Sequence, residues 1–425
     1  MSEDPGKEGR FAQGIPVVPA FDGYRAYAIL AVVVLHLLIF SGVLVAAEGD
    51  WRFQLSQATV GQAVEVLFIV SGFVLFLPTA ARGGESGDVR AYALRRAARL
   101  MPAYWATLAG VLVLIAAVPL SPPIDLPGVG SVAAHGLLLQ TPVQLFEAVP
   151  MGFGVNGPVW TLSLEAIFYG LLPLVAGWYF RRPIAGLAVA AAVTAAWHEL
   201  IVHYDSVVSV VGLDPSPETS LRLQTSALTQ FPFFAFSFAA GMTGAWAYVR
   251  LRERQGERST SGVVAIQVGA LAALALFAYL IARESTGGGV VLGAEVGRRS
   301  SVVSLGFSAS LATLMVATAL APGGLSRPFA HPAARRLGDI SYGIYLSHMV
   351  VITYALGMLG LDDEDLAGSA ATQARLVTGD GSAGTLIALA PWSCRRHCSM
   401  GTPRRGSSSS RSAGGPAATA GASRR

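Results

Sequence analysis

The residues with the clearest chemical potential are an arginine and a histidine in the first long apolar segment. This segment opens with the run FDGYRAYAILAVVVLH, which contains Arg25 and His36. On a helix both side chains fall on one face. Histidine titrates near neutral pH and can take a proton from a hydroxyl group. An ionisable side chain inside a membrane is costly and usually functional, although packing against a neighbouring helix is the alternative for His36.

Four arginines, at positions 90, 95, 96 and 99, precede the apolar segment 100–120. Among them, Arg96 and Arg99 have i, i+3 spacing, so their guanidinium groups face the same way on a helix. Paired guanidiniums bind phosphate oxygens well, which predicts a site for a phosphorylated ligand. The alternative is topological, because cytoplasmic arginines also anchor a membrane span.

A carboxylate, Glu165, lies inside another apolar segment with Thr161 and Tyr169 on its face. An unpaired carboxylate at that depth must be protonated or bound to a partner. We therefore expect Glu165 to serve function rather than structure.

Two other motifs combine polar and small residues. Ser341, Tyr345 and His348 form one stripe by i, i+4, i+7 spacing, and this stripe must face other helices or a cavity. It need do no more than hold helices together. The pair Ser71-Gly72 permits close backbone approach, and both tight packing and a direct chemical role are open for it.

The composition places these residues in a membrane protein. Of 425 residues, 53% are hydrophobic and 13% are charged, whereas about a quarter are charged in a soluble domain. The net charge of +4 does not indicate a nucleic-acid partner, because the arginines gather in short loops. Both cysteines, Cys394 and Cys398, lie near the C-terminal end, so no disulfide framework is expected. The other histidines lack metal-ligand spacing, and no metal is expected.

We predict an all-α, polytopic transmembrane helix bundle with nine clear spans. The spans are 24–47, 62–79, 100–120, 158–180, 183–202, 228–249, 262–282, 301–321 and 340–360. A more polar segment, 131–149, is a weaker candidate. If it does not span, 16 loop arginines and lysines fall on one side of the membrane and 6 on the other, whereas the tally is 12 against 10 if it spans. We therefore predict that it is re-entrant or interfacial and that the N-terminus is cytoplasmic.

The chain divides into three predicted parts. Residues 1–20 form a short polar cytoplasmic segment, residues 21–377 form the membrane domain, and residues 378–425 have the composition of a disordered tail. No cleavable signal peptide is expected. The approach to another helix after residue 360 is interrupted near residue 378, so an expected final span is missing. Our hypothesis is that the tail is an altered or out-of-frame terminus.

The motifs resemble, in order, those of the acyltransferase-3 family of integral membrane O-acyltransferases. The matching elements are Phe21–Arg25 with His36, Val66–Phe73, Arg95–Trp105, Trp160–Tyr169 and Gly338–His348. The resemblance implies ten spanning helices and an acyl group taken from cytoplasmic acyl-CoA, with acetyl-CoA as the expected donor. It also implies that the acceptor is a sugar hydroxyl of a cell-surface glycan or of a glycosylated natural product.

The same resemblance implies roles for the candidate residues. His36 is the expected catalytic base, Arg25 and Glu165 support it, and Arg96 and Arg99 hold the donor. The residues expected to support the site or bind substrate are Asp22, Ser71, Tyr169, Ser341, Tyr345 and His348.

Helix lengths predict an order of these residues in depth. We expect the arginine pair at the cytoplasmic mouth, His36 near the middle of the bilayer and Glu165 toward the outside. A function from another class is a proton-coupled transporter or flippase that uses His36 and Glu165; it would form no ester. A third hypothesis, motivated by the tail, is an inactive remnant.

Overall fold

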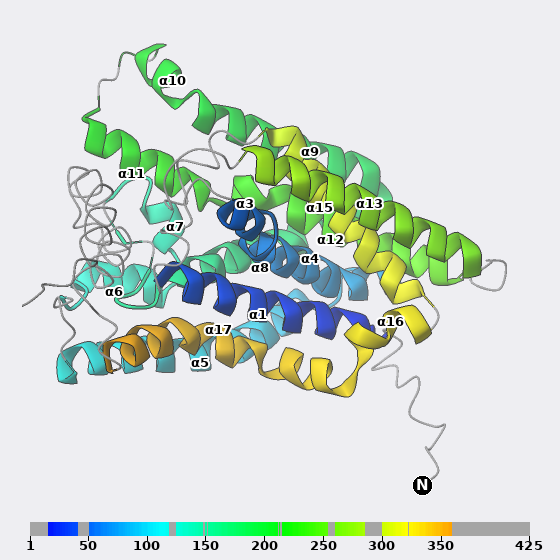
Figure 1. The fold of residues 1–425 in the computed structure, drawn as a ribbon, viewed down its shortest axis with the longest axis horizontal. Coiled ribbons are helices and arrows are strands. Elements are labelled where there is room, and N and C mark those ends of the chain that lie inside the picture. Colours follow the sequence, from blue (N-terminus) through cyan, green and yellow to red (C-terminus); the bar gives the residue numbers. More distant parts are fainter. Residues whose placement is uncertain are drawn as a thin grey trace, which may run out of the picture.

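The long helices lie along a common direction and form one bundle (Figure 1). The computed structural model describes residues 16–40, 51–118, 125–147, 149–150, 152–210, 212, 215–253, 260–284, 300–321 and 323–358. In these residues the regular elements are helices, apart from an isolated β-bridge between Phe153 and Asn156. The predicted all-α class is therefore confirmed for this part of the chain.

The described helices follow one another in this order: α1 (Pro19–Phe40), α3 (Trp51–Ala58), η2 (Val60–Gln62), α4 (Ala63–Ala81), α5 (Val89–Ala117), α6 (Val129–Gly136), α7 (Gln140–Val143), η3 (Gly157–Val159), α8 (Trp160–Arg181), α9 (Pro183–Val202), α10 (Tyr204–Val210), α11 (Pro217–Leu228), α12 (Phe231–Glu253), α13 (Thr260–Glu284), α15 (Ser301–Leu320), α16 (Gly323–Ala330) and α17 (Pro332–Met358).

Seven helical stretches among the described residues are long and apolar enough to cross a bilayer. They are Pro19–Phe40, Trp51–Ala81, Val89–Ala117, Gly157–Arg181, Pro183–Val202, Ser261–Glu284 and Ser301–Leu320. These match seven of the nine predicted spans. The other two correspond to α12 and α17, which have 23 and 27 residues. Both carry charged residues at one end, Arg250, Arg252 and Glu253 in α12 and Arg335, Arg336 and Asp339 in α17. The total of nine spans stays a prediction.

The weaker candidate segment, 131–149, does not form a helix of spanning length. It contains the short helices α6 and α7, separated by a turn in which Leu138 has a φ of 57°. The side chains of His135, Gln140, Thr141 and Gln144 are buried. The Gln140 amide donates to the Val159 carbonyl, just before α8, over 3.1 Å. Whether this segment lies at membrane depth stays a prediction.

The helix α5 begins well before the span predicted from hydropathy. The side chain of Asp88 accepts hydrogen bonds from the backbone N–H groups of Arg90 and Ala91, over 2.9 and 3.2 Å. This N-cap satisfies donors that the first helical turn cannot pair. Arg96 and Arg99 therefore lie inside a continuous helix rather than in the loop that precedes it.

The described part of the bundle has two large apolar cores and a small cluster around Ile39 and Phe53. One core is built mainly by α4, α8, α12 and α15 around Phe73, Phe76 and Phe238, and the other by α1, α5 and α17 around Ile29 and Tyr104. The helix pairs with the most extensive contacts include α4 with α12 and α1 with α17. The first and last described helices thus lie side by side (Figure 1).

Several predictions concern residues outside the described part of the chain. These are the tail at 378–425 with its missing span and both cysteines, most of the N-terminal segment 1–20, and the ends of the first and last predicted spans. Within the N-terminal segment, Pro19 already belongs to α1.

Candidate active site

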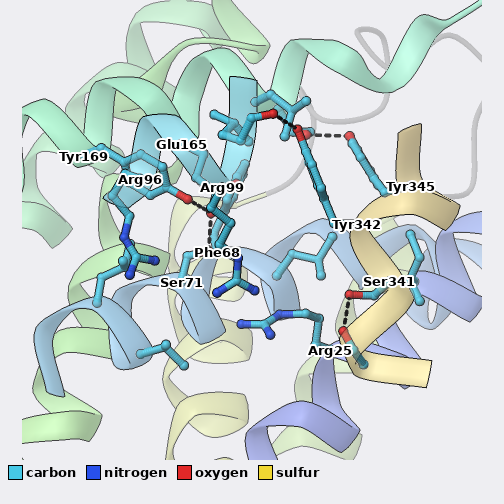
Figure 2. Close-up of a pocket in the computed structure, with 18 of the residues that line it drawn as sticks. Arg25, Phe68, Ser71, Arg96, Arg99, Glu165, Tyr169, Ser341, Tyr342 and Tyr345 are labelled. Atoms are coloured by element: carbon cyan, nitrogen blue, oxygen red, sulfur yellow. Dashed lines mark hydrogen bonds between the residues drawn. The ribbon is translucent and has the colours of Figure 1, made fainter. Parts of the chain in front are cut away.

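A cavity of about 120 Å³ lies where α1, α4, α5, α8 and α17 meet. A single buried water needs roughly 15 Å³ of such space, so the cavity has room for a ligand group or for several waters. Figure 2 shows the charged and hydroxyl side chains of these helices converging on it.

Three arginines line this cavity. Arg25 comes from α1, whereas Arg96 and Arg99 come from successive turns of α5. Nε of Arg96 is buried and has no hydrogen-bond partner in the described part of the chain. Since like charges repel when they are drawn together, this arrangement is suited to an anion between them.

The carboxylate of Glu165 faces the same cavity and accepts two hydrogen bonds. Oε1 accepts from the Ser71 hydroxyl over 3.0 Å and from the Tyr169 hydroxyl over 2.7 Å. Tyr169 lies one turn further along α8, which confirms the shared face predicted from the sequence. Asp339 is the other carboxylate of the lining, so guanidinium groups outnumber carboxylates there.

Asp22 does not line the cavity. Its carboxylate lies between Arg25 and Arg335, at 4.0 Å from Nη1 of Arg25 and 3.8 Å from Nε of Arg335. The link joins the start of α1 to the start of α17. Asp22 is therefore an ion-pair partner of Arg25 and Arg335 and does not face a ligand in the cavity.

The predicted polar stripe of α17 is divided between two regions. Ser341 and Tyr345 line the cavity, and the Tyr345 hydroxyl bonds to Thr161 and to the Pro158 carbonyl at the start of α8. His348 lies a turn beyond the cavity, with its ring centroid 5.7 Å from that of Tyr345. Tyr345 thus stands between the cavity and His348.

His36 pairs with His348 instead of lining the cavity. Nδ1 of His36 is 3.2 Å from Nε2 of His348 and 2.9 Å from the Val32 carbonyl oxygen. His348 is buried and His36 is half-buried. The pairing joins α1 to α17 at a level further along both helices than the arginines.

The predicted order of His36 and Glu165 in depth is wrong. Glu165 shares its cavity with Arg25, whereas His36 lies about 26 Å along α1 from its start at Pro19. The reason is the contact between Tyr345 and Thr161, which places the start of α8 near the level of the histidines. Residues further along α8, including Glu165, therefore lie toward the arginines.

Some residues of the site were missed by sequence reasoning. Tyr342 lines the cavity and donates from its hydroxyl to the Leu100 carbonyl over 2.8 Å, which ties α17 to α5. Asp339 also lines it. Both lie outside the i, i+4, i+7 stripe, because a cavity where five helices meet receives side chains from a wider arc of α17 than one stripe.

Comparison with known proteins adds three findings. The profile of the protein family described as "Acyltransferase domain" (Acyl_transf_3) matches residues 18–376. The peptidoglycan O-acetyltransferase OatA of Listeria monocytogenes is 26% identical over 82% of this chain and 51% of its own length. The acyltransferase MdmB of Streptomyces mycarofaciens is 35% identical over 38% of this chain and 39% of its own length. The chain thus spans about half or less of each relative. No solved structure matches it significantly.

Proposed function

The chain belongs to the acyltransferase-3 family, and it has several apolar helices that can cross a membrane. From this family membership we infer that it is a membrane acyltransferase. We propose that it moves a short acyl group, acetyl in the first instance, from acyl-CoA to a sugar hydroxyl. The acceptor is a cell-surface glycan or a glycosylated natural product. We also propose that the N-terminus is cytoplasmic, so that the donor enters near the start of α1.

The observation that carries this proposal is the convergence of Arg25, Arg96 and Arg99 on one cavity. Guanidinium groups bind phosphate oxygens through paired, charge-assisted hydrogen bonds. The buried Nε of Arg96, which has no hydrogen-bond partner among the described residues, supports an anionic ligand there. The phosphates of CoA meet this requirement.

The separation of the arginines from His36 also agrees with such a donor. Arg25 and His36 are roughly 16 Å apart along α1. In acyl-CoA a long arm joins the phosphates to the thioester, so the anchored end and the reacting carbon are necessarily distant. In our proposal this arm passes Tyr345 and brings the thioester to the histidines.

The proposed reaction needs a base and a leaving group. The acceptor hydroxyl gives its proton to His36 while its oxygen attacks the thioester carbonyl carbon. The carbon–sulfur bond then breaks, and the thiolate takes the proton back from His36. The net products are an ester and free CoA. Glu165, held by Ser71 and Tyr169, balances the charge of the arginines around the donor.

The acceptor class is supported by one relative. The Listeria protein is named a peptidoglycan O-acetyltransferase, and peptidoglycan carries sugar hydroxyls. Because this chain spans only 51% of that relative, the acceptor is part of our proposal.

The deciding experiment is an acyl-transfer assay on the purified protein in lipid nanodiscs. Radiolabelled acetyl-CoA is supplied with peptidoglycan fragments in one reaction and a glycosylated macrolide in another. We expect a labelled ester on a sugar in at least one. The absence of ester from well-folded protein with every acceptor and acyl-CoA tested would overturn the proposal. Proton-coupled solute movement in proteoliposomes without ester formation would instead favour a transporter.

We expect Arg96→Ala to raise the KM for acyl-CoA by about 10- to 100-fold with little change in kcat, since a hydrogen bond to a charged group is typically worth about 1.5–3 kcal/mol. Steady-state kinetics with varied acyl-CoA measures this. The matched control is Arg95→Ala, because Arg95 is on the same helix but exposed and outside the cavity lining. Equal KM values for Arg96→Ala and Arg95→Ala would contradict the donor assignment.

A further inference from the structure

The histidine pair makes three contacts that together fix where its protons are. Nδ1 of His348 is 2.6 Å from the Tyr345 carbonyl oxygen. Nδ1 of His36 is 2.9 Å from the Val32 carbonyl oxygen and 3.2 Å from Nε2 of His348. Within the described residues, no carboxylate forms an ion pair with either ring.

A carbonyl oxygen can only accept a hydrogen bond, so each Nδ1 must carry a proton. A neutral imidazole has one N–H group, which leaves Nε2 of His348 as an acceptor. The Nδ1–H group of His36 is then shared between Val32 and His348. The opposite tautomer of either ring would set a nitrogen lone pair against a carbonyl oxygen. Two neutral rings therefore satisfy all three contacts in a single arrangement.

This arrangement leaves Nε2 of His36 with an unused lone pair. In the part of the chain that the structure describes, Nε2 of His36 forms no hydrogen bond. We propose that His348 is a positioning residue that holds His36 in the Nδ1–H tautomer and so makes Nε2 of His36 the proton acceptor. The inference rests on the proposed function, in which His36 is the base.

The pair also stabilises the charge that forms during transfer. When Nε2 of His36 takes the hydroxyl proton, the ring becomes an imidazolium whose Nδ1–H group points at two acceptors, Val32 and His348. In serine hydrolases a carboxylate holds the base in the same way. Here a neutral ring and a backbone carbonyl do so, which avoids burying another charge at this level of the bundle.

Burial explains why the geometry persists. His348 is 5% exposed, and the neighbouring Tyr345 and Leu346 are 6% and 2% exposed. The Leu346 carbonyl accepts a hydrogen bond from the buried Asn156 amide over 2.8 Å. The α17 backbone that carries His348 is therefore held between α1 and the segment before α8.

The kinetic test compares two substitutions of His348 with a matched control. We expect His348→Leu to lower kcat about 10- to 100-fold, the range for a hydrogen bond to a charged group, with the KM for acyl-CoA unchanged. We expect His348→Gln, whose side-chain oxygen can accept from His36, to give an intermediate kcat. His203→Leu alters an exposed histidine and should match the wild type. Wild-type kcat in His348→Leu, or equal losses in folded Leu and Gln variants, would overturn the inference.

A spectroscopic test does not depend on activity. Nitrogen NMR of wild-type protein labelled at histidine reports which nitrogen of each ring is protonated, and the signals lost in His36→Gln and His348→Gln assign the pair. We expect Nδ1–H on both rings. Nε2–H on either ring would overturn the inference even if His348→Leu fails to fold. If wild-type protein forms no ester but shows these tautomers, the proposed function fails while the proton arrangement stands.

Discussion

We expect His36→Ala to lower acyl transfer by about 10²- to 10⁴-fold, the usual contribution of a general base, without unfolding the protein. The loss should fall on kcat, because His36 does not line the cavity assigned to the donor. Steady-state kinetics with varied acyl-CoA, alongside size-exclusion chromatography of the same preparation, measures both parts of this expectation.

The matched control is His203→Ala, which removes an exposed imidazole from the end of α9 and should retain wild-type turnover. His36 is half-buried and bonds only to the Val32 carbonyl and to His348 among the described residues, so its loss leaves no buried charge behind. Full turnover by well-folded His36→Ala protein would refute the base assignment and with it the role proposed for His348.

The convergence of the charged residues follows the predicted spacings. Arg96 and Arg99 were expected on one helix face, and both line the cavity. Tyr169 was expected beside Glu165 and donates to it. Such predictions succeed because i, i+3 and i+4 neighbours meet within one helix, whatever the rest of the fold does.

The sequence did not predict which helices are neighbours or how far they are shifted along one another. The contact of His36 with His348 depends on α1 lying beside α17, at opposite ends of the described chain. The same holds for the order of Glu165 and His36, which is set by the contact of Tyr345 with Thr161. A single sequence shows which side chains share a face of each helix. It does not show which helix packs against that face or how the two helices are aligned along their axes.

The pair Ser71-Gly72 shows how packing and chemistry share one motif. The sequence left open tight packing or a chemical role, and in the structure the two residues make different contacts. Ser71 donates to Glu165 in the cavity, while Gly72 packs against the backbone of α12 and α4 continues unbroken through both residues. Adjacent residues of α4 thus face different neighbours, and the position of the first depends on the close approach at the second.

The close approach of α4 and α12 has glycines on both sides. A Cβ atom on Gly72 would lie 2.1 Å from the Phe238 carbonyl oxygen, and one on Gly241 would lie 2.1 Å from the Ile69 carbonyl oxygen. These obstacles are backbone atoms and cannot rotate away. Close contact through small residues is a principal source of helix association in a membrane.

We therefore expect Gly72→Ala to destabilise the protein by about 3 kcal/mol or more, at or above the upper end of typical overpacking costs. To admit the methyl group, α4 and α12 must separate. That movement also strains the hydrogen bond from Ser237 of α12 to Glu65 of α4. A lower melting temperature in nanodiscs and reduced recovery from detergent are the expected readouts, with Gly241→Ala behaving alike.

The control is Gly110→Ala in α5, where an added Cβ meets nothing within 4 Å. There alanine should be neutral or stabilising, since glycine costs up to about 1 kcal/mol in a helix interior. The same substitution thus has opposite signs at two helical glycines, because one faces a neighbouring backbone and the other does not. Equal melting temperatures for Gly72→Ala, Gly110→Ala and the wild type would show that α4 and α12 are not in backbone contact, and the position of Ser71 against Glu165 would lose its physical basis.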